Sequence, residues 1–268
     1  MKKRIAFVHN AMWEMYNFRG ELLQELKAKG YEITVICPPD EKNAHYFTDL
    51  GIKLLTVPMS RKGTNIKEDV QLVKNLFKVY KKEKFDLVFH YTIKPNIYGT
   101  LAAKLAGIKS IAITTGLGYV FLHNNITSLI AKFMYKFSLA FANEVWFLND
   151  DDMNIFLDKD LITERQAFKL PSEGINTKRF VPKEKNRKDS KTVFLMIARV
   201  LYDKGFNEYL EAAKLIKAQR NDVEFQLLGA IDSGNPSGVP QSVVKDAVSN
   251  GFINYLGTTS DVLPIIRE

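Results

Sequence analysis

The sequence predicts an α/β protein with two parallel β-sheets, one in each of two domains. Short runs rich in β-branched and aromatic residues alternate with stretches whose apolar residues recur at helical spacing. A polar run interrupts this alternation once, and the alternation then starts again. At 268 residues with 46% hydrophobic residues, the chain is long enough to form more than one core.

Seven strands are expected before the interruption, in the segments RIAFVH, EITVIC, IKLLTV, DLVFH, SIAIT, EVWFL and AFKL. The intervening segments have helical periodicity, and Gly30 is a plausible C-terminal cap of the first helix. The apolar stripes expected to be buried on the first two clear helices are Phe18, Leu22, Leu23 and Leu26, and then Val70, Val73, Phe77 and Tyr80.

The interruption at residues 183–191, KEKNRKDSK, reads as an interdomain linker or a long surface loop. It separates a predicted first domain, residues 1–182, from residues 192–268, where TVFLMIA, VEFQLL and FINYLG predict three more strands. Two such sheets predict a cleft at their carboxyl edges. A sheet of only three visible strands would expose apolar surface, so we expect a fragment or a chain that depends on a complementing chain.

The net charge and the composition restrict the possible partners of the protein and its location in the cell. A formal charge of +8 and a pI near 9.3 favour nucleotide phosphates, a phospholipid surface or nucleic acid. Nucleic acid is disfavoured, because the lysines are scattered and no nucleic-acid motif is present. No long apolar run or cleavable leader is visible, and Cys37 has no partner for an internal disulfide. We expect a cytoplasmic protein, with attachment to the inner face of the plasma membrane as one option.

The stretch MIARVLYDKGF places two cations between a strand and a helix. Arg199 offers a planar fork and Lys204 a compact charge, and loops of this kind meet a helix N-terminus that attracts phosphate. The pair could therefore neutralise a diphosphate leaving group. The alternative is a solvated loop with two unrelated cations.

Several segments together resemble one enzyme family. FLMIARVLYDKGFNEYLEAA is similar to the segment that opens the C-terminal domain of retaining glycosyltransferases of family four, which have the GT-B fold. PSEGINTKRFVP resembles the interdomain segment of that family, QLLGA its second C-domain strand, and INYLGTTSDV a segment before a later helix. In YNFRGELLQELKAKGYEITVICP, TIKPNIYGTLAAKLAGI and TTGLGYVF, the chain resembles bacterial enzymes that build lipid-linked oligosaccharides, capsule and lipopolysaccharide.

The resemblance implies a GT-B-like fold, with two Rossmann-like domains facing a cleft and the second one incomplete. It implies that Arg199 and Lys204 hold the donor diphosphate, and that Gly229 and Gly257 keep the backbone close to the nucleotide. The expected donor is a UDP-linked N-acetylhexosamine or hexose, used without a metal cofactor. The expected acceptor is polyprenyl-diphosphate-linked or a polysaccharide, and the transfer retains the anomeric configuration.

The resemblance also suggests residues of the first domain that would line the cleft. Thr115 stands where many family members have histidine, in a glycine-rich run that could equally form a simple turn. His90 ends the expected strand DLVFH and Lys94 follows it, and either ligand contact or a structural role is open to His90. Arg19 could contact an acceptor phosphate or be a solvated helix residue. The complete set for the first domain is Asn17, Arg19, His90, Lys94, Thr115, Gly116 and Gly118, and the predicted hinge is Glu173 and Gly174.

Other functions remain open. The family carries two glutamates beyond the third C-domain strand, a region that this sequence does not contain, so the chain alone is expected to bind the donor weakly and to turn over little. An inactive acceptor-binding or partner-binding module is one alternative, and a GT-B-type nucleotide-sugar epimerase is another. Asp150, Asp151 and Asp152 could hold a metal as in GT-A glycosyltransferases, but an N-terminal helix cap is simpler. A dehydrogenase is disfavoured, because the first strand leads into no glycine motif.

The segment ITSLIAKFMYKFSLAF carries a broad apolar stripe. Such a stripe usually marks a buried core helix. Membrane insertion, or contact with anionic lipid through Lys132 and Lys136, is the alternative. The stripe consists of Ile126, Leu129, Ile130, Phe133, Met134, Phe137 and Phe141.

Overall fold

A computed structural model describes residues 2–60, 65–117, 121, 126–182 and 191–267. The chain divides into two compact units, Met1–Gly174 and Ile175–Glu268. This division lies eight residues before the boundary expected at residue 182 (182 − 174), so residues 175–182 group with the second unit. Residues 183–190 of the predicted linker lie outside the described residues.

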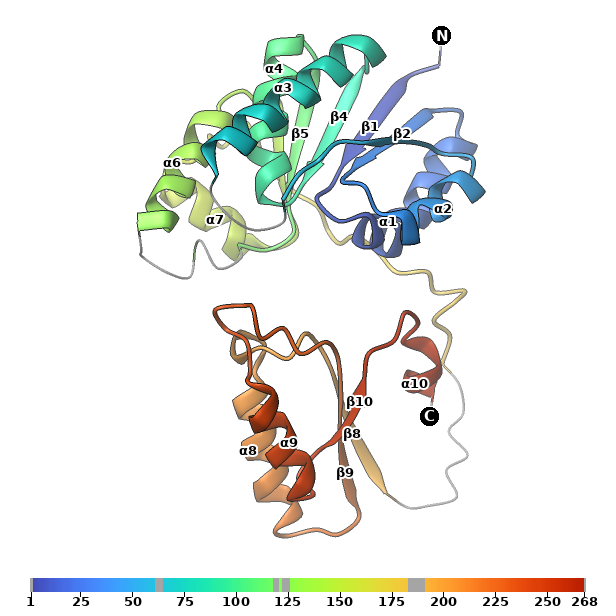
Figure 1. Cartoon of the computed structure of the whole chain (residues 1–268), viewed down its shortest axis with the longest axis vertical. Helices are drawn as coiled ribbons and strands as arrows, with labels where there is room; N and C mark the ends of the chain where they lie inside the picture. Colours follow the sequence, from blue (N-terminus) through green and yellow to red (C-terminus); the bar gives the residue numbers. More distant parts are fainter. Residues whose placement is uncertain (1, 61–64, 118–120, 122–125, 183–190, 268) are drawn as a thin grey trace. The chain divides into compact units, whose positions relative to one another are not determined.

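The first unit is built on one seven-stranded parallel sheet in the order β3-β2-β1-β4-β5-β6-β7 (Figure 1). All seven predicted strands are confirmed. The order reverses between β1 and β4, which are adjacent although two strands separate them along the chain. The strands are β1 (Arg4–Val8), β2 (Glu32–Cys37), β3 (Lys53–Thr56), β4 (Leu87–Tyr91), β5 (Lys109–Thr114), β6 (Glu144–Phe147) and β7 (Ala167–Lys169).

Helices cover both faces of this sheet, as a parallel sheet requires. α1 (Met12–Ala28) and α2 (Glu41–Asp49) pack on one face. The other face carries α3 (Ile66–Glu83), a π-helical turn η1 (Pro95–Gly99), α4 (Thr100–Ala106), α6 (Ile126–Leu139) and α7 (Asp150–Asp158). Strand side chains alternate between the two cores, so Phe7 and Val35 face α1 while Ala6 and Ile36 face α3.

The predicted stripe on α1 was partly wrong. Phe18 is 58% exposed and Leu22 is 46% exposed, whereas Met12, Met15 and Leu23 are buried. The helix begins at Met12, and the spacing of its methionines sets the buried face. Prediction from leucine and phenylalanine alone therefore chose a stripe rotated towards solvent.

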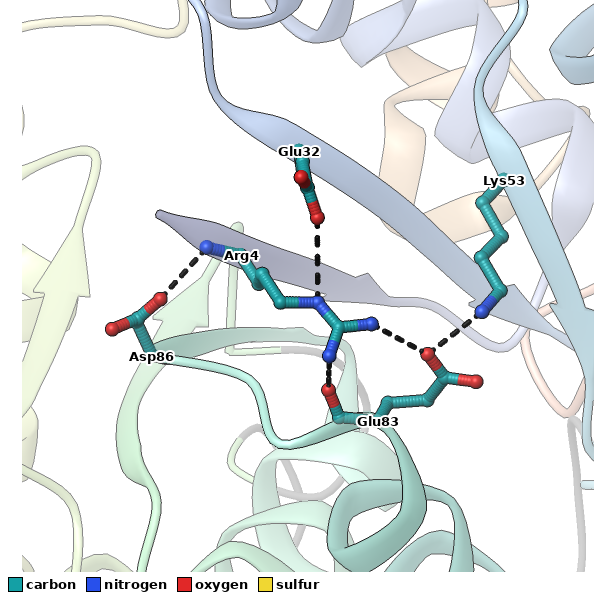
Figure 2. Close-up of polar contacts among 5 residues, drawn as sticks. All are labelled: Arg4, Glu32, Lys53, Glu83 and Asp86. Carbon is teal, nitrogen blue, oxygen red and sulfur yellow. Dashed lines mark hydrogen bonds and ion pairs between the residues drawn. The ribbon is translucent and has the colours of Figure 1, made fainter. Parts of the chain in front are cut away.

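Ion pairs link the elements at the amino-terminal ends of the strands in this sheet. Ligands commonly bind at the opposite, carboxyl ends of the strands. Figure 2 shows the Glu83 carboxylate between two cations: Arg4 Nη2 lies 2.9 Å from Glu83 Oε2, and Lys53 Nζ lies 2.7 Å from the same oxygen. The backbone N–H of Arg4 donates to Asp86 at 2.8 Å. The hydrogen bond from Lys53 lowers the pKa of Glu83. These contacts tie β1 and β3 to the end of α3.

The second unit has a parallel sheet of three strands, as predicted, and the structure gives their order as β10-β9-β8. Helices α8 and α9 lie against one face (Figure 1). On the other face Ile197 is 43% exposed and Leu195 is half-buried, which matches the expected apolar exposure. The elements are β8 (Thr192–Ile197), a 3-10 turn η2 (Tyr202–Lys204), α8 (Phe206–Lys217), β9 (Val223–Leu228), α9 (Gln241–Ser249), β10 (Asn254–Gly257) and α10 (Leu263–Arg267).

Candidate functional site

The two predicted phosphate-binding cations lie in one short turn of the second unit, after β8 and before α8. The turn is fixed from both sides, because Val200 forms a bridge with Ile231 and Leu201 forms one with Gly238. η2 then ends at Gly205, whose φ of +83° suits glycine, and α8 starts directly after it. The sequence thus places Arg199 and Lys204 beside the N-terminus of a twelve-residue helix.

Both cations are available to an external anion. The Arg199 side chain is 58% exposed, and its nearest carboxylate is that of Asp232, with Nη1 and Oδ2 3.8 Å apart. Lys204 is exposed and forms no ion pair with any residue that the structure describes. Arg199 thus has one long ion pair, and Lys204 has none in the described ranges, so both exposed cations can still form charge-assisted hydrogen bonds with a phosphate.

Gly229 and Gly257 lie at the carboxyl ends of β9 and β10, at the same edge of this sheet. The N–H of Gly229 donates to Gly257 O at 2.8 Å. A Cβ at Gly229 would lie 1.7 Å from Ala198 O, whereas one at Gly257 would have no neighbour within 4 Å. Packing against the backbone beside Arg199 is thus a sufficient reason for glycine at residue 229. The role of either glycine towards a nucleotide stays a prediction.

In the first unit, the edge where a ligand is expected lies between β1 and β4, where the strand order reverses. His9 follows β1 there, and its ring centroid lies 6.1 Å from that of Tyr91. Thr92 follows β4 with a φ of +71°, a strained value for a β-branched residue and one that occurs often at functional sites. Sequence reasoning missed both residues, although the expected strand RIAFVH ends in His9 just as the expected strand DLVFH ends in His90.

Arg19 is buried and not solvated, which excludes one of its two expected roles. Its guanidinium carbon lies 4.4 Å above the Tyr91 ring, and its Nη2 forms an ion pair with Glu173. Asn17 is exposed on the same helix. Glu173 is the last side chain before Gly174, at which the first unit ends. The Arg19–Glu173 pair thus attaches this end of the unit to α1, and any contact with a ligand stays a prediction.

The structure corrects the expectation that His90 faces a cleft. Its ring is 0% exposed, Tyr80 Oη lies 2.9 Å from Nε2, and Thr100 Oγ1 lies 3.3 Å from Nδ1. Gly99 packs so closely that a Cβ there would lie 2.6 Å from the ring. The strand-end pattern failed because η1 and α3 cover this position. Burial lowers the pKa of His90 to about 3.

This burial predicts an acid-dependent loss of stability. Because the folded-state pKa is about 3 and the ordinary value is 6.5, the unfolded chain binds the extra proton between these values. Stability is then full above pH 6.5 and falls as the pH drops, by up to about 1.4 kcal/mol per pH unit. His90→Gln should flatten this fall, as measured by urea unfolding between about pH 6 and pH 4. His45→Gln, on the surface of α2, is the control. An equally steep fall in His90→Gln would exclude His90 as the cause.

Lys94 is buried and already paired. Its Nζ lies 2.6 Å from Asp69 Oδ1 and donates to Ser60 Oγ at 2.9 Å, while Tyr98 donates to the other oxygen of Asp69 at 2.8 Å. Lys94, Asp69 and Ser60 border an open pocket of about 270 Å³ beside the start of α3. Lys94 therefore stabilises this wall of the pocket through its pairing with Asp69. Its charge is not free to face a ligand.

Thr115 and Gly116 are exposed after β5, and Gly116 has a φ of +139° with open space around it. Gly118 lies outside the described residues. Just before them, Thr114 is buried, and its Oγ1 has no hydrogen-bond partner within the described part of the chain. Tyr91 pairs with Ile113 in the sheet, so Thr92 and Thr114 each follow one member of this pair at the carboxyl ends of two adjacent strands.

The run of three aspartates is used for local structure. Asn149 caps α7, accepting from the N–H of Asp152 at 2.7 Å, and Asp150 pairs with Lys169 at 2.8 Å. This confirms the capping interpretation. In the ranges that the structure describes, no three His, Cys, Asp or Glu side chains are grouped as metal ligands.

A family model described as "Glycosyl transferase 4-like" matches residues 4–149. Among curated proteins, the chain is 31% identical over 284 residues to N,N'-diacetylbacillosaminyl-diphospho-undecaprenol alpha-1,3-N-acetylgalactosaminyltransferase of Campylobacter jejuni, covering 99% of this chain and 72% of that protein. It is 26% identical over 196 residues to UDP-Gal:alpha-D-GlcNAc-diphosphoundecaprenol alpha-1,3-galactosyltransferase of Escherichia coli, covering 69% of this chain and 50% of that protein.

Among solved structures, a glycosyltransferase from Rickettsia africae superimposes with a TM-score of 0.70 at 20% identity. The match covers 99% of this chain and 71% of that one. At this level of identity the likeness establishes the fold, which is the GT-B-like pair of Rossmann-type units that the sequence predicted.

Proposed function

The chain belongs to the glycosyl transferase 4-like family and is a glycosyltransferase, and on that premise we propose that it moves a sugar from a UDP-sugar to an acceptor linked to undecaprenyl diphosphate. The names of the two curated relatives support this choice, since both contain an undecaprenyl diphosphate acceptor and one contains UDP-galactose. The sugar is a hexose or an N-acetylhexosamine in both names. We place the reaction at the cytoplasmic face of the membrane.

The turn with Arg199 and Lys204 is the observation that carries this proposal. Two exposed cations stand beside a helix N-terminus, at the carboxyl edge of a parallel sheet. The helix adds partial positive charge and free N–H groups in the same place. We propose that this turn binds the donor diphosphate.

The proposed chemistry follows from these charges. The bond between the anomeric carbon and a diphosphate oxygen breaks, the acceptor hydroxyl oxygen takes its place on the same face, and the hydroxyl proton passes to the departing diphosphate. Arg199 and Lys204 stabilise the negative charge that develops on the leaving group. In this proposal Arg199 and Lys204 stabilise the charge that a metal ion stabilises in other sugar transferases.

The proposed acceptor side is the edge of the first unit formed by the ends of β1, β4 and β5. Thr92 and Thr114 each have a buried hydroxyl oxygen with no partner in the described residues. Buried polar groups are normally satisfied, so two such hydroxyls at one edge favour a polar ligand. Thr115 and Gly116 follow directly and are exposed.

Two alternatives predict different products. A nucleotide-sugar epimerase would alter the free sugar nucleotide without any acceptor, and its support is weaker because both curated relatives are named as transferases. A binding module would hold the lipid-linked sugar without turnover.

The test is to incubate the protein with a UDP-sugar labelled in the sugar and with undecaprenyl diphosphate carrying one sugar residue. Transfer would move the label into the organic phase only when the acceptor is present. Calorimetry should also detect UDP binding by the same protein. An epimerised free nucleotide in the absence of acceptor, or a failure to bind UDP at all, would contradict the proposal.

A further inference from the structure

Helix α6 buries two serines together with Tyr135 and Leu139, and it exposes several of its other large apolar residues on the outer side. Ser128 and Ser138 are 1% and 0% exposed. The Ser138 hydroxyl donates to Met134 O at 2.8 Å, which satisfies it inside the unit. In contrast, the side chains of the outer face are 37% to 70% exposed, and these are Leu129, Ile130, Phe133, Phe137 and Phe141. The expectation of a buried stripe was therefore wrong.

We name these five outer side chains the α6 face. Leu129, Ile130, Phe133 and Phe137 follow one another at helical spacing on α6. Phe141 lies two residues beyond its end, and its ring meets that of Phe137 edge to face with centroids 5.6 Å apart. A contiguous apolar surface of this kind is costly in water and marks a contact site. The helix is amphipathic, with its hydrophobic side away from the core of its own unit.

The charges around the α6 face are positive. Lys132 and Lys136 lie on the same helix, and Lys104 Nζ lies 5.5 Å from the centre of the Phe141 ring. Residues 126–143 contain no aspartate or glutamate. Lysine stems can lie along apolar surface while their charges reach outwards, so this border suits an anionic layer above the apolar face.

We propose that the α6 face docks on an anionic phospholipid bilayer, with its apolar side chains at the level of the lipid headgroups. A second copy of this chain is a less suitable partner, because a two-fold contact would bring like lysine charges together. No helix in the described ranges is long and apolar enough to cross a membrane. The inference rests on the proposed function in one respect, that a lipid-linked acceptor would bring the protein to a bilayer.

Vesicle sedimentation tests this face. Vesicles of phosphatidylglycerol and phosphatidylcholine in equal parts should bind the protein, whereas pure phosphatidylcholine should bind it more weakly. Phe133→Ser with Phe137→Ser should weaken binding roughly tenfold for each phenylalanine. Lys132→Gln with Lys136→Gln should weaken it roughly fivefold for each lysine at low salt. Leu215→Ser, which changes a side chain 65% exposed on α8, is the matched control and should bind like the parent.

The failure of this proposal can be told apart from a failure of the proposed function. The phenylalanine variant should keep the circular dichroism and UDP affinity of the parent, because the changed side chains are exposed and lie in the other unit. Unchanged vesicle binding by this variant would overturn the proposal. So would concentration-dependent dimers of the parent that the variant abolishes, with no vesicle binding. Loss of UDP binding in the parent, with vesicle binding intact, would contradict only the proposed function.

Discussion

Replacing Arg199 by alanine is expected to weaken UDP binding roughly 10-fold to 150-fold, because a charge-assisted hydrogen bond contributes about 1.5 to 3 kcal/mol. Lys204→Ala should have an effect of similar size. The structure supports a direct effect, since both side chains are exposed and neither is held in a close ion pair. Their removal should therefore leave the fold of the second unit intact, and the loss should appear in affinity alone.

Arg199→Lys separates charge from geometry. Lysine keeps the charge but cannot reproduce the planar fork that binds two phosphate oxygens, so its affinity should fall between the parent and Arg199→Ala. Lys245→Ala, an exposed change on α9 of the same unit, is the control for net charge. Calorimetric titration with UDP at fixed low salt measures all four variants. If Arg199→Ala and Lys204→Ala both keep the affinity of the parent, the turn is not the diphosphate site.

The strands were predictable from the sequence because each has a pattern that burial imposes on it. A parallel sheet covered on both faces needs continuous apolar runs, and ITVIC and SIAIT are such runs. The buried, unpaired Cys37 fits the same reasoning, and burial raises its pKa to about 12. The positions of Arg199 and Lys204 were predictable for the same reason. Once the end of the strand and the start of the helix are known, the connection that carries both cations is known too.

Side-chain roles at strand ends were less predictable, because they depend on what covers each end. The expected strands RIAFVH and DLVFH both end in histidine, but in the structure His90 lies inside β4, paired with Val8, whereas His9 follows β1. η1 and the side chain of Tyr80 enclose His90, whereas His9 lies beside Tyr91 at the reversal of strand order. The two sequence runs alone do not show that β4 continues past its histidine while β1 stops before its own.

The α6 face shows the same limit for helices. Periodicity correctly indicated one apolar stripe, but periodicity does not state which side of the helix meets the sheet. The buried side here is held by Tyr135 and Leu139, together with two buried serines, Ser128 and Ser138. Large apolar residues at helical spacing thus predict that one face of the helix is shielded from water. The surface that shields it can belong to another molecule rather than to the same domain.

Gly229→Ala is expected to destabilise the second unit by more than about 4 kcal/mol, which exceeds the effect of most single substitutions. The added Cβ would lie 1.7 Å from Ala198 O, and that oxygen belongs to the backbone of the strand end and cannot rotate away. Either the carboxyl ends of β8 and β9 separate or the residue leaves its φ of +155°. Both changes displace the turn that carries Arg199, so UDP binding should be lost together with stability.

Gly257→Ala is the matched control for this substitution. Gly257 lies at the same edge with a φ of +77°, but a Cβ there meets nothing within 4 Å. Only the backbone preference remains, which costs about 1 to 2 kcal/mol. The two tryptophans, Trp13 and Trp146, both lie in the first unit, so their fluorescence follows that unit alone during urea unfolding. Amide hydrogen exchange of residues 192–257 follows the other unit. If Gly229→Ala exchanges no faster than Gly257→Ala, close packing between β8 and β9 is not the reason for a glycine there, and a role in ligand binding becomes the better explanation.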